Sequence, residues 1–462
     1  MRERTSCFIT SCFQDQSYGA ANQAWWEALD YCVRRSEPYS EGMGLETNRR
    51  WLLVIIAGAF VIRVGWGLAQ PPTIDQRLPD QAEYFSLAQN LLREHALKFY
   101  DDRFGDEVYA FRTPGYPLFL AACGANVRLA RVAQAGLDAS TALAIYLLAR
   151  RWLRIGASLL AAGLVALNPF LIYFSGLILS ETLFTAMLAW GLVLLVWKPN
   201  VVWGGIVLAL SILVRPGAVG LPVVLGVAAV LARGRQWGSG EVAITEAPRF
   251  SWPVGATMVA LTLLVLAPWA VRNHALLGEW VWLTSNGGVT KYDGFNPDAT
   301  GASDQRFLTS LQMRGLREIG ELQRDEYLSE LADRWIRETC RTDKTRLFKL
   351  TLTKIGRLWS PVPLSAEFGG RALYKVVAMG WAIPFYALIV LGLWKGNLST
   401  GSKWLLLTAA VYFTIVHALS VGSLRYRVPV EPVLAVLAAA GAAVLFDQAK
   451  RPGWKREQGS NG

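Results

Sequence analysis

The chain has few residues of the kinds that bind metal ions or form disulfides. It contains five cysteines and three histidines in 462 residues. The histidines are too scattered to form a His-rich site, and the cysteines show neither CxxC nor zinc-site spacing. The sequence therefore predicts no disulfide framework and no cysteine or histidine metal cluster. The cysteines are Cys7, Cys12, Cys32, Cys123 and Cys340.

The first 48 residues lack the apolar core that a signal peptide requires. They are polar and carry three of the five cysteines. Met43 lies a few residues before Arg49 and Arg50, where the first long apolar segment begins. We interpret residues 1–48 as a cytoplasmic tail or a mispredicted start with Met43 as the alternative, and residues 448–462 as a second cytoplasmic tail.

The chain also lacks a basic stripe interleaved with aromatics, so its net charge of +11 does not indicate nucleic-acid binding. Hydrophobic residues make up 53% of the chain, and the mean hydropathy is +0.29. The apolar residues come in blocks of about twenty, the length of helix that crosses about 30 Å of hydrocarbon. The sequence predicts an all-α polytopic membrane protein. The ten expected spans are about 51–69, 129–149, 155–173, 182–197, 201–214, 217–232, 252–271, 376–394, 404–422 and 429–446.

The distribution of basic residues predicts the orientation of these spans. With both termini inside, most lysines and arginines lie on the cytoplasmic side, although Arg128 and Arg131 do not. Two long segments, 70–128 and 272–375, are then outside. We expect a catalytic transmembrane module over 49–271 that includes the first outer segment, a helical lid over 272–375, and a final set of transmembrane helices over 376–447. The short outer loops carry Arg215, Arg425 and Arg427.

The first outer segment begins with acids and a tyrosine at helical spacing. Asp80 and Tyr84 are four residues apart and therefore share one face of a short amphipathic helix at the membrane surface. Asp80 and Glu83 also fit a helix cap with its capping-box partner. Local sequence leaves capping and catalysis as equal alternatives for Asp80.

An acidic loop (Asp101, Asp102, Asp106 and Glu107) is followed by Phe111-Arg-Thr-Pro-Gly-Tyr116-Pro. The prolines end regular structure and then start a helix of about ten residues, too short to span and so re-entrant or interfacial. Arg112 either binds a substrate or extends to the lipid headgroups, and the second alternative is the more usual one.

Two acids fall within apolar sequence. Glu181 lies in a nearly unbroken apolar run, where a carboxylate costs a few kcal/mol to bury, so we expect it to face a polar cavity. The alternative is a short hydrated loop. Asp138 has Ser140 and Thr141 beside it, and we interpret it as an interhelical hydrogen-bonding residue.

Further cations lie at the outer ends of later spans. Arg272 and Asn273 follow Pro268-Trp269 as one span leaves the membrane, and Arg425 and Arg427 precede the last span. Between them, residues 304–360 are rich in amphipathic helix, which indicates a lid or platform at the membrane surface.

Together these motifs resemble the polytopic glycosyltransferases of the GT-C fold, especially the bacterial family 39-like proteins related to protein O-mannosyltransferases and the aminoarabinose transferase of lipid A. The match runs from about 50 to 446. Its motifs are Asp80-x-x-x-Tyr84, Arg112-Thr-Pro-Gly-Tyr-Pro-Leu-Phe-Leu, Ser180-Glu181-Thr-Leu-Phe, Pro268-Trp269-x-x-Arg272-Asn273 and Arg425-Tyr-Arg427-x-Pro429.

The resemblance implies transfer of a hexose or pentose from a polyprenyl-phosphate carrier to a lipid, polysaccharide or protein acceptor, outside the cytoplasmic membrane. It implies that Asp80 is the base or acceptor-binding acid, that Glu181 is a second acid and that Arg112 holds the carrier phosphate. Many relatives have two adjacent acids where this chain has Asp80-Gln81. Glu83 is our candidate for the missing acid.

The candidate site therefore has two groups of residues. The candidate catalytic acids are Asp80, Glu83 and Glu181. The candidate substrate-binding residues are Tyr84, Arg112, Tyr116, Arg272, Asn273, Arg425 and Arg427. No cofactor is established by the sequence, and a divalent metal is left open. The alternative functions are a transporter or flippase of lipid-linked saccharide and a non-catalytic scaffold.

Overall fold

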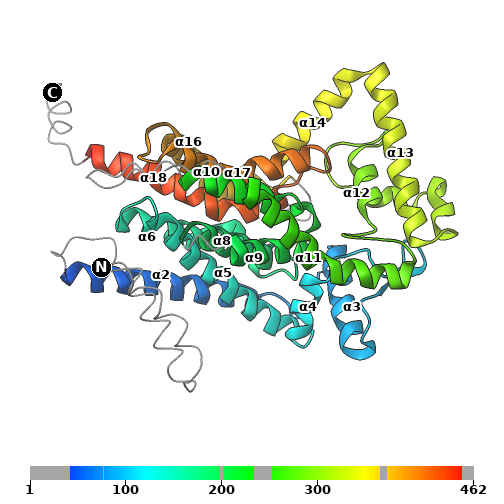
Figure 1. Ribbon diagram of the computed structural model, residues 1–462, viewed down its shortest axis with the longest axis horizontal. Helices are drawn as coiled ribbons and strands as arrows, with labels where there is room; N and C mark the ends of the chain where they lie inside the picture. The colour runs from blue at the N-terminus through cyan, green and yellow to red at the C-terminus, as the bar shows by residue number, and fades with distance from the viewer. Residues whose placement is uncertain (1–41, 76–77, 198–200, 234–251, 365–371, 450–462) are drawn as a thin grey trace. The chain divides into compact units, whose positions relative to one another are not determined.

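The computed structural model describes residues 42–75, 78–197, 201–233, 252–364 and 372–449 (Figure 1). The chain divides into two units, Met1–Arg50 and Trp51–Gly462. The described part of the first unit, residues 42–50, is helical and forms the start of α2 (Gly42–Ala69). Most of the predicted N-terminal tail, with Cys7, Cys12 and Cys32, and most of the C-terminal tail lie outside the described residues.

The second unit contains a helical bundle in which a helix or helix pair covers each predicted span. Within the described ranges, five helices are long and apolar enough to cross a membrane, or six if the bent pair α6–α7 is one span. The prediction of an all-α polytopic membrane protein is confirmed. After α2 the bundle comprises α5 (Val127–Arg150), α6 (Ile155–Leu167), α7 (Pro169–Ser175), α8 (Glu181–Trp197), α9 (Val201–Val214), α10 (Leu221–Arg233), α11 (Trp252–Leu277), α16 (Ala372–Lys395), α17 (Thr400–Ala418) and α18 (Glu431–Ala449).

The predicted span 155–173 is not one straight helix. Its two parts, α6 and α7, meet at an angle of 48°. Asn168 causes the break, because its extended backbone ends α6 and its side chain accepts hydrogen bonds from the Phe170 and Leu171 amides, which caps α7. Pro169 then occupies the first turn of α7, where its missing amide proton has no cost.

Small residues let two of the spanning helices approach closely. A Cβ on Gly392 of α16 would lie 2.0 Å from the Leu437 carbonyl oxygen, and one on Gly441 of α18 would lie 2.1 Å from that of Leu388. Such small-residue contacts are a common way for transmembrane helices to pack. The α16–α18 contact therefore depends on glycine at these two positions.

Asp138 makes the interhelical contact predicted for it. Its carboxylate pairs with Arg63 of α2, and both side chains are buried. Arg63 also donates to the Ala166 and Val165 carbonyls at the end of α6, at 2.7 and 2.9 Å. Arg131, which does not fit the expected charge distribution, donates at 2.6 Å to the Pro71 carbonyl just after α2. Both arginines thus bind helix ends within the protein.

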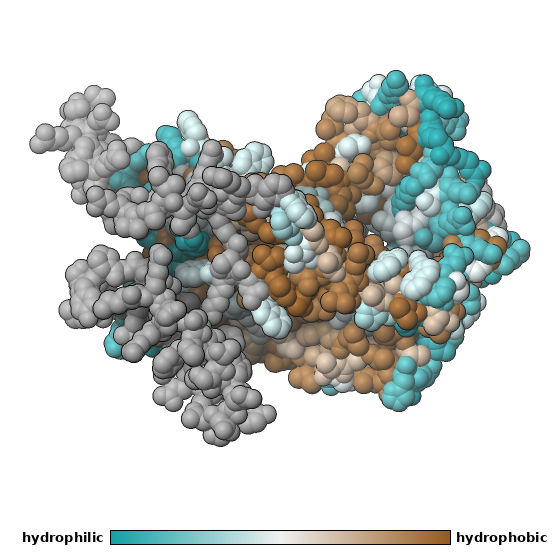
Figure 2. Space-filling view, in the orientation of Figure 1, coloured by the Kyte–Doolittle hydropathy of each residue, from teal (hydrophilic) through white to brown (hydrophobic). Residues whose placement is uncertain are grey.

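The two outer segments lie at the same end of the bundle and share a hydrophobic core (Figure 1). Their edge away from the bundle is hydrophilic, whereas the surface of the bundle is mostly hydrophobic (Figure 2). The predicted short helix after Arg112 is α4, while the hairpin was not expected. The first segment contains α3 (Pro79–Glu94), an antiparallel hairpin of β1 (Phe99–Asp101) and β2 (Asp106–Val108), and α4 (Gly115–Ala122). The second contains α12 (Gly287–Gly294), η2 (Gln305–Thr309), η3 (Leu311–Arg317), α13 (Glu321–Thr342) and α14 (Lys344–Leu358).

Glu321 joins the two outer segments. Its carboxylate accepts hydrogen bonds from the backbone amides of Tyr109 and Ala110, at 2.7 and 2.9 Å, and from the Ser285 hydroxyl. Arg324, one turn further along α13, pairs with Asp106 of the hairpin at 3.1 Å. The predicted lid is therefore bound to the segment that carries Asp80.

Candidate functional site

Asp80 lies in the first turn of α3 and Glu83 follows three residues later, but neither caps the helix. The N-cap is Leu78, which makes no side-chain cap hydrogen bond. Asp80 Oδ1 instead accepts from Arg112 Nη2 at 2.5 Å, and Glu83 Oε2 accepts from Arg112 Nε at 2.6 Å. The capping-box interpretation is therefore wrong, because both carboxylates bind an arginine that the helix itself does not contain.

These contacts belong to a continuous row of alternating charges. Arg112 links Glu83 to Asp80, and Arg425 links Asp80, at 2.5 Å, to Glu181. Four carboxylates alternate with four arginines, so the row is electrically neutral when all are ionised. We call it the charge row: Asp101, Arg103, Glu83, Arg112, Asp80, Arg425, Glu181 and Arg215.

The ends of the charge row were not found from the sequence. Arg103 pairs with Asp101 at 2.6 Å and with Glu83 at 2.7 Å, and Arg215 Nη1 lies 3.2 Å from Glu181 Oε1. One signal was visible for Arg215, a cation beside proline in a short outer loop. For Arg103 no sequence signal distinguishes it from a solvated loop arginine.

Local structure presents each of these side chains at one end of the bundle. Glu181 is the first residue of α8, where a carboxylate is stabilised by the helix dipole. Arg215 has extended backbone, as expected for a residue before proline, and so ends α9. Arg425 follows Ser423, whose hydroxyl accepts from the Arg425 amide and starts the short helix η4 (Leu424–Tyr426).

Asp80 is the most accessible carboxylate of the charge row. Its side chain is 25% exposed, against 7% for Glu83 and 1% for Glu181. Arg112 and Arg425, which flank it, are 18% and 14% exposed. A ligand that reaches this end of the bundle would therefore meet Asp80 between two guanidinium groups.

The two arginines control the ionisation of Asp80. Burial alone raises the pKa of a carboxyl group, but the Arg112 and Arg425 guanidiniums outweigh it and hold the pKa of Asp80 well below its usual range. Burial opposes the charge on Arg112 as well, yet Asp80 and Glu83 raise the pKa of Arg112. Asp80 is thus an ionised and poorly basic carboxylate while both arginines contact it.

Tyr84 and Tyr116 form an aromatic wall beside the charge row. The Tyr84 ring lies 5.5 Å from the Arg112 guanidinium carbon, and burial raises the pKa of its hydroxyl. Tyr116 packs edge-on against Tyr84 at 5.0 Å and donates to Gln134 Oε1 at 2.6 Å. Tyr116 is fully buried, and Tyr84, which contacts both Tyr116 and Arg112, lies between Tyr116 and the charge row.

Three predicted substrate-binding residues make other contacts. Arg272 donates to the Tyr109 and Leu97 carbonyls, both at 2.6 Å, and Asn273 donates to the Val281 carbonyl at 2.9 Å. Arg427 is buried and pairs with Glu431 at 2.7 Å. These contacts anchor backbone and helix ends, and a role for Arg272, Asn273 and Arg427 in substrate binding stays a prediction.

Gln81, where many relatives have a second acid, points away from the charge row. Its side-chain oxygen accepts from the Ile178 amide at 2.9 Å, and the residue is buried. Gln81 therefore ties α3 to the loop before α8. Glu83, one turn away from Asp80, is the acid that shares an arginine with it.

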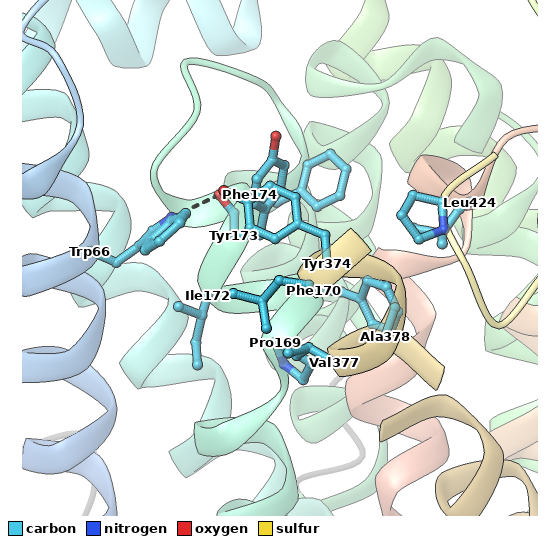
Figure 3. A pocket seen from close by; sticks show the side chains of 12 residues that line it. Trp66, Pro169, Phe170, Ile172, Tyr173, Phe174, Tyr374, Val377, Ala378 and Leu424 are labelled. Carbon is cyan, nitrogen blue, oxygen red and sulfur yellow. Dashed lines mark hydrogen bonds between the residues drawn. The ribbon is translucent and has the colours of Figure 1, made fainter. Parts of the chain in front are cut away.

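An apolar cavity of about 240 Å³ is lined mainly by residues of α2, α7 and α16 (Figure 3). Trp66, Tyr173 and Tyr374 line it, with the Trp66 indole donating to the Tyr173 carbonyl at 3.3 Å. Leu424 also lines it and directly precedes Arg425 in the chain. One residue that lines the cavity is therefore the chain neighbour of an arginine of the charge row.

The residues of the charge row do not fit a divalent metal site. Each of its carboxylates pairs with an arginine, whereas calcium, magnesium and manganese need free carboxylate or carbonyl oxygens. Nor do His, Cys, Asp or Glu side chains form any group of three suited to a metal ion within the described residues. As they stand, the carboxylates of the charge row are paired with guanidiniums.

Comparisons with known proteins give matches at the level of structure. Neither a protein-family model nor a curated protein sequence matches the chain. The oligosaccharyltransferase of Archaeoglobus fulgidus, tethered to an acceptor peptide, is similar with a TM-score of 0.50 and 17% identity, over 86% of this chain and 50% of that one. The same enzyme, AglB, with an inhibitory peptide and a dolichol-phosphate, is similar with a TM-score of 0.50 and 16% identity, over 87% and 51%.

The chain therefore spans about half the length of these solved structures. At such low identity the likeness concerns the fold. It confirms the expected GT-C type arrangement of helices, without distinguishing family 39-like proteins from others of this type. The chain has the polytopic helical fold found in archaeal oligosaccharyltransferase.

Proposed function

We propose that the chain is a membrane glycosyltransferase that moves a sugar from a polyprenyl-phosphate carrier to an acceptor. The observation that carries this proposal is the position of the partly exposed Asp80 between Arg112 and Arg425, with an apolar cavity lined by Leu424, the chain neighbour of Arg425. A carboxylate, two cations and an apolar surface are the groups that an acceptor hydroxyl, a carrier phosphate and a prenyl chain require.

In this proposal the carrier binds through its phosphate and through the adjoining part of its prenyl chain. Guanidinium groups donate paired hydrogen bonds to phosphate oxygens, and Arg112 and Arg425 would both do so. The cavity at Leu424 would take the first part of the prenyl chain, because Leu424 is covalently adjacent to Arg425. The similar fold of AglB was solved in complex with a dolichol-phosphate, which supports a lipid phosphate as ligand.

The transfer step then needs a base and a stabilised leaving group. The acceptor hydroxyl oxygen forms a bond to the anomeric carbon of the sugar while its proton passes to Asp80. The bond between that carbon and the carrier phosphate oxygen breaks, and the polyprenyl phosphate leaves with the electron pair. A positioned base contributes about 10²–10⁴-fold to such a step, and cations stabilise the departing phosphate.

Donor binding would also make Asp80 a better base. At rest the two arginines hold the pKa of Asp80 low, which makes it a weak proton acceptor. A phosphate that draws Arg112 and Arg425 toward itself removes part of this stabilisation, so the pKa of Asp80 rises. Glu181, which also pairs with Arg215, would continue to bind Arg425 from the other side. Proton abstraction is thereby favoured only after the carrier has bound.

The finer assignment rests on the sequence motifs. We infer a family 39-like enzyme of the cytoplasmic membrane, with the site on the extracytoplasmic side and a hexose or pentose as the transferred sugar. The acceptor is a lipid, polysaccharide or protein, and the acceptor peptide tethered to one similar structure supports the last of these. The charge row lies at one end of the bundle, whereas transporters tend to place such groups at the bilayer midplane.

Sugar transfer from a radiolabelled polyprenyl-phosphate donor in membranes that contain the chain tests the proposal. The expected result is loss of label from the lipid donor, release of polyprenyl phosphate and appearance of label in an acceptor fraction. Label that stays on the intact donor but moves to the other leaflet would instead establish a flippase. Membranes with the Asp80→Asn variant provide the background rate.

A further inference from the structure

Helix α14 of the lid carries an exposed apolar stripe on one side. Phe348 is 64% exposed and Leu352, one turn later, is 50% exposed. The opposite side of the helix is packed, with Leu350 and Leu358 buried. In Figure 2 the surface of this arm of the lid is hydrophobic toward the bundle and hydrophilic on its outer edge. An apolar stripe this exposed on a packed helix indicates a contact with something outside the chain.

The C-terminal end of α14 packs against the end of a bundle helix, α17. Trp359, its C-cap, donates from its indole nitrogen to Thr414 Oγ1 at 3.0 Å. Thr414 lies one turn before Ala418, where α17 ends. Arg427 Nη1 also donates to the Leu358 carbonyl at 3.2 Å. The C-terminal end of α14 is therefore held against the last turn of α17.

From this anchored end α14 rises obliquely away from the bundle (Figure 1). At 1.5 Å per residue, Leu352 and Phe348 lie about 10 and 16 Å along the helix from Trp359. Because 404–422 is one of the expected spans and Trp359 contacts the last turn of α17, we place the stripe near the expected membrane surface. Ile415 of α17 and Leu419, its C-cap, are also exposed, at 57% and 65%, so the helix end that Trp359 contacts carries exposed apolar residues too.

Basic residues flank the stripe at its outer end. Lys344 and Lys349 are exposed, and Lys349 borders an open groove of about 430 Å³ together with Arg346 and three threonines. Asp343 is the one acid that lines the groove as described. Helices with an apolar face and a basic flank bind at the membrane interface, where anionic lipids attract the basic residues.

We propose that α14 is an interfacial membrane helix: its Phe348–Leu352 stripe contacts acyl chains of the outer leaflet, and Lys344 and Lys349 bind the phosphates of anionic lipid headgroups. The anchored C-terminus, the exposed apolar residues at the end of α17 and the basic flank together favour a bilayer over a second protein. The proposal does not depend on sugar transfer, because it rests on the contacts and exposed surface of α14 and α17 and not on the charge row.

Photo-crosslinking of the full chain in lipid nanodiscs tests this contact. Phe348 is replaced by the photoreactive analogue p-benzoylphenylalanine, and in a matched control the same analogue replaces Tyr327, an aromatic residue on α13 that is 42% exposed. The nanodiscs contain phosphatidylcholine with or without phosphatidylglycerol. We expect lipid adducts at position 348 in about tenfold excess over position 327, detected by mass spectrometry.

The charge component is tested by Lys344→Glu combined with Lys349→Glu. In mixed nanodiscs this change should lower the phosphatidylglycerol share of the adducts at position 348, whereas Lys344→Arg with Lys349→Arg should preserve it. Equal adducts at positions 348 and 327, or adducts between two protein copies at position 348, would overturn the membrane contact. A phosphatidylglycerol share that charge reversal leaves unchanged would overturn headgroup binding. Thermal unfolding of each variant confirms that it is folded.

Discussion

Replacing Asp80 by asparagine should separate turnover from donor binding. Asparagine keeps the shape of the side chain but cannot accept the proton of an acceptor hydroxyl. The expected loss in kcat is about 10²–10⁴-fold, or roughly 3–5 kcal/mol in the activation barrier at 1.36 kcal/mol per tenfold. Asp80 also competes with a carrier phosphate for Arg112 and Arg425, which contact it at 2.5 Å. The KM for the donor should therefore stay constant or fall.

Glu83→Gln is the matched control. Glu83 also pairs with two arginines, Arg103 and Arg112, so its replacement removes as many ion pairs from the charge row. Its side chain is only 7% exposed, against 25% for Asp80, and it is therefore shielded from an acceptor. We expect its effect on kcat to be much smaller than that of Asp80→Asn.

The assay is initial-rate transfer from a radiolabelled polyprenyl-phosphate donor at several donor concentrations, with the amount of folded protein measured in each membrane. A kcat within about threefold of the unmodified chain, too small for a lost general base, would refute the role of Asp80. In that case Glu83 is the next candidate. Equal losses in the two variants would show that the intact charge row matters and not the base.

Three further predictions concern cations, pH and packing. Arg425→Ala should raise the donor KM about tenfold or more, since hydrogen bonds to charged groups contribute about 1.5–3 kcal/mol, while Arg427→Ala, which breaks the buried pair with Glu431, should lower the thermal unfolding temperature. Because the pKa of Asp80 is lowered, its protonation should not reduce kcat/KM between about pH 5 and 8, and a pH series that shows such an acid limb for Asp80 would contradict this. Gly392→Ala should destabilise the α16–α18 contact by about 1–3 kcal/mol in thermal or denaturant unfolding, whereas Gly380→Ala, with no atom within 4 Å of its Cβ, should not.

The class of the protein and its helices follow from the sequence. Membrane spans are local features, because each must place about twenty apolar residues in hydrocarbon and satisfy its backbone internally. The same local logic found the short helix after Arg112 and the interhelical role of Asp138. The bend at Asn168 could not be predicted from local sequence, because an asparagine in an apolar run is compatible with both a continuous helix and a helix cap.

Asp80, Arg112, Glu181 and Arg425 could also be selected as candidates from the sequence, because charged residues beside apolar spans are costly unless they are paired. Their pairing could not be predicted. Arg425 and Asp80 are separated by 345 positions, and nothing in either local sequence specifies the other as partner. The tertiary structure decided that Asp80 binds two arginines and does not cap α3.

The tertiary structure likewise added residues that no motif distinguishes. Arg103 and Arg215 complete the charge row, while Arg272 and Arg427, which resemble substrate-binding cations in sequence, bind backbone carbonyls. The reason is physical: hydrophobicity and helix length act along the chain, but the energy of a charged group depends on what the fold places within a few ångströms of it. The sequence thus determined that this is a polytopic membrane protein with charges at the ends of its helices, and the fold decided which of those charges meet.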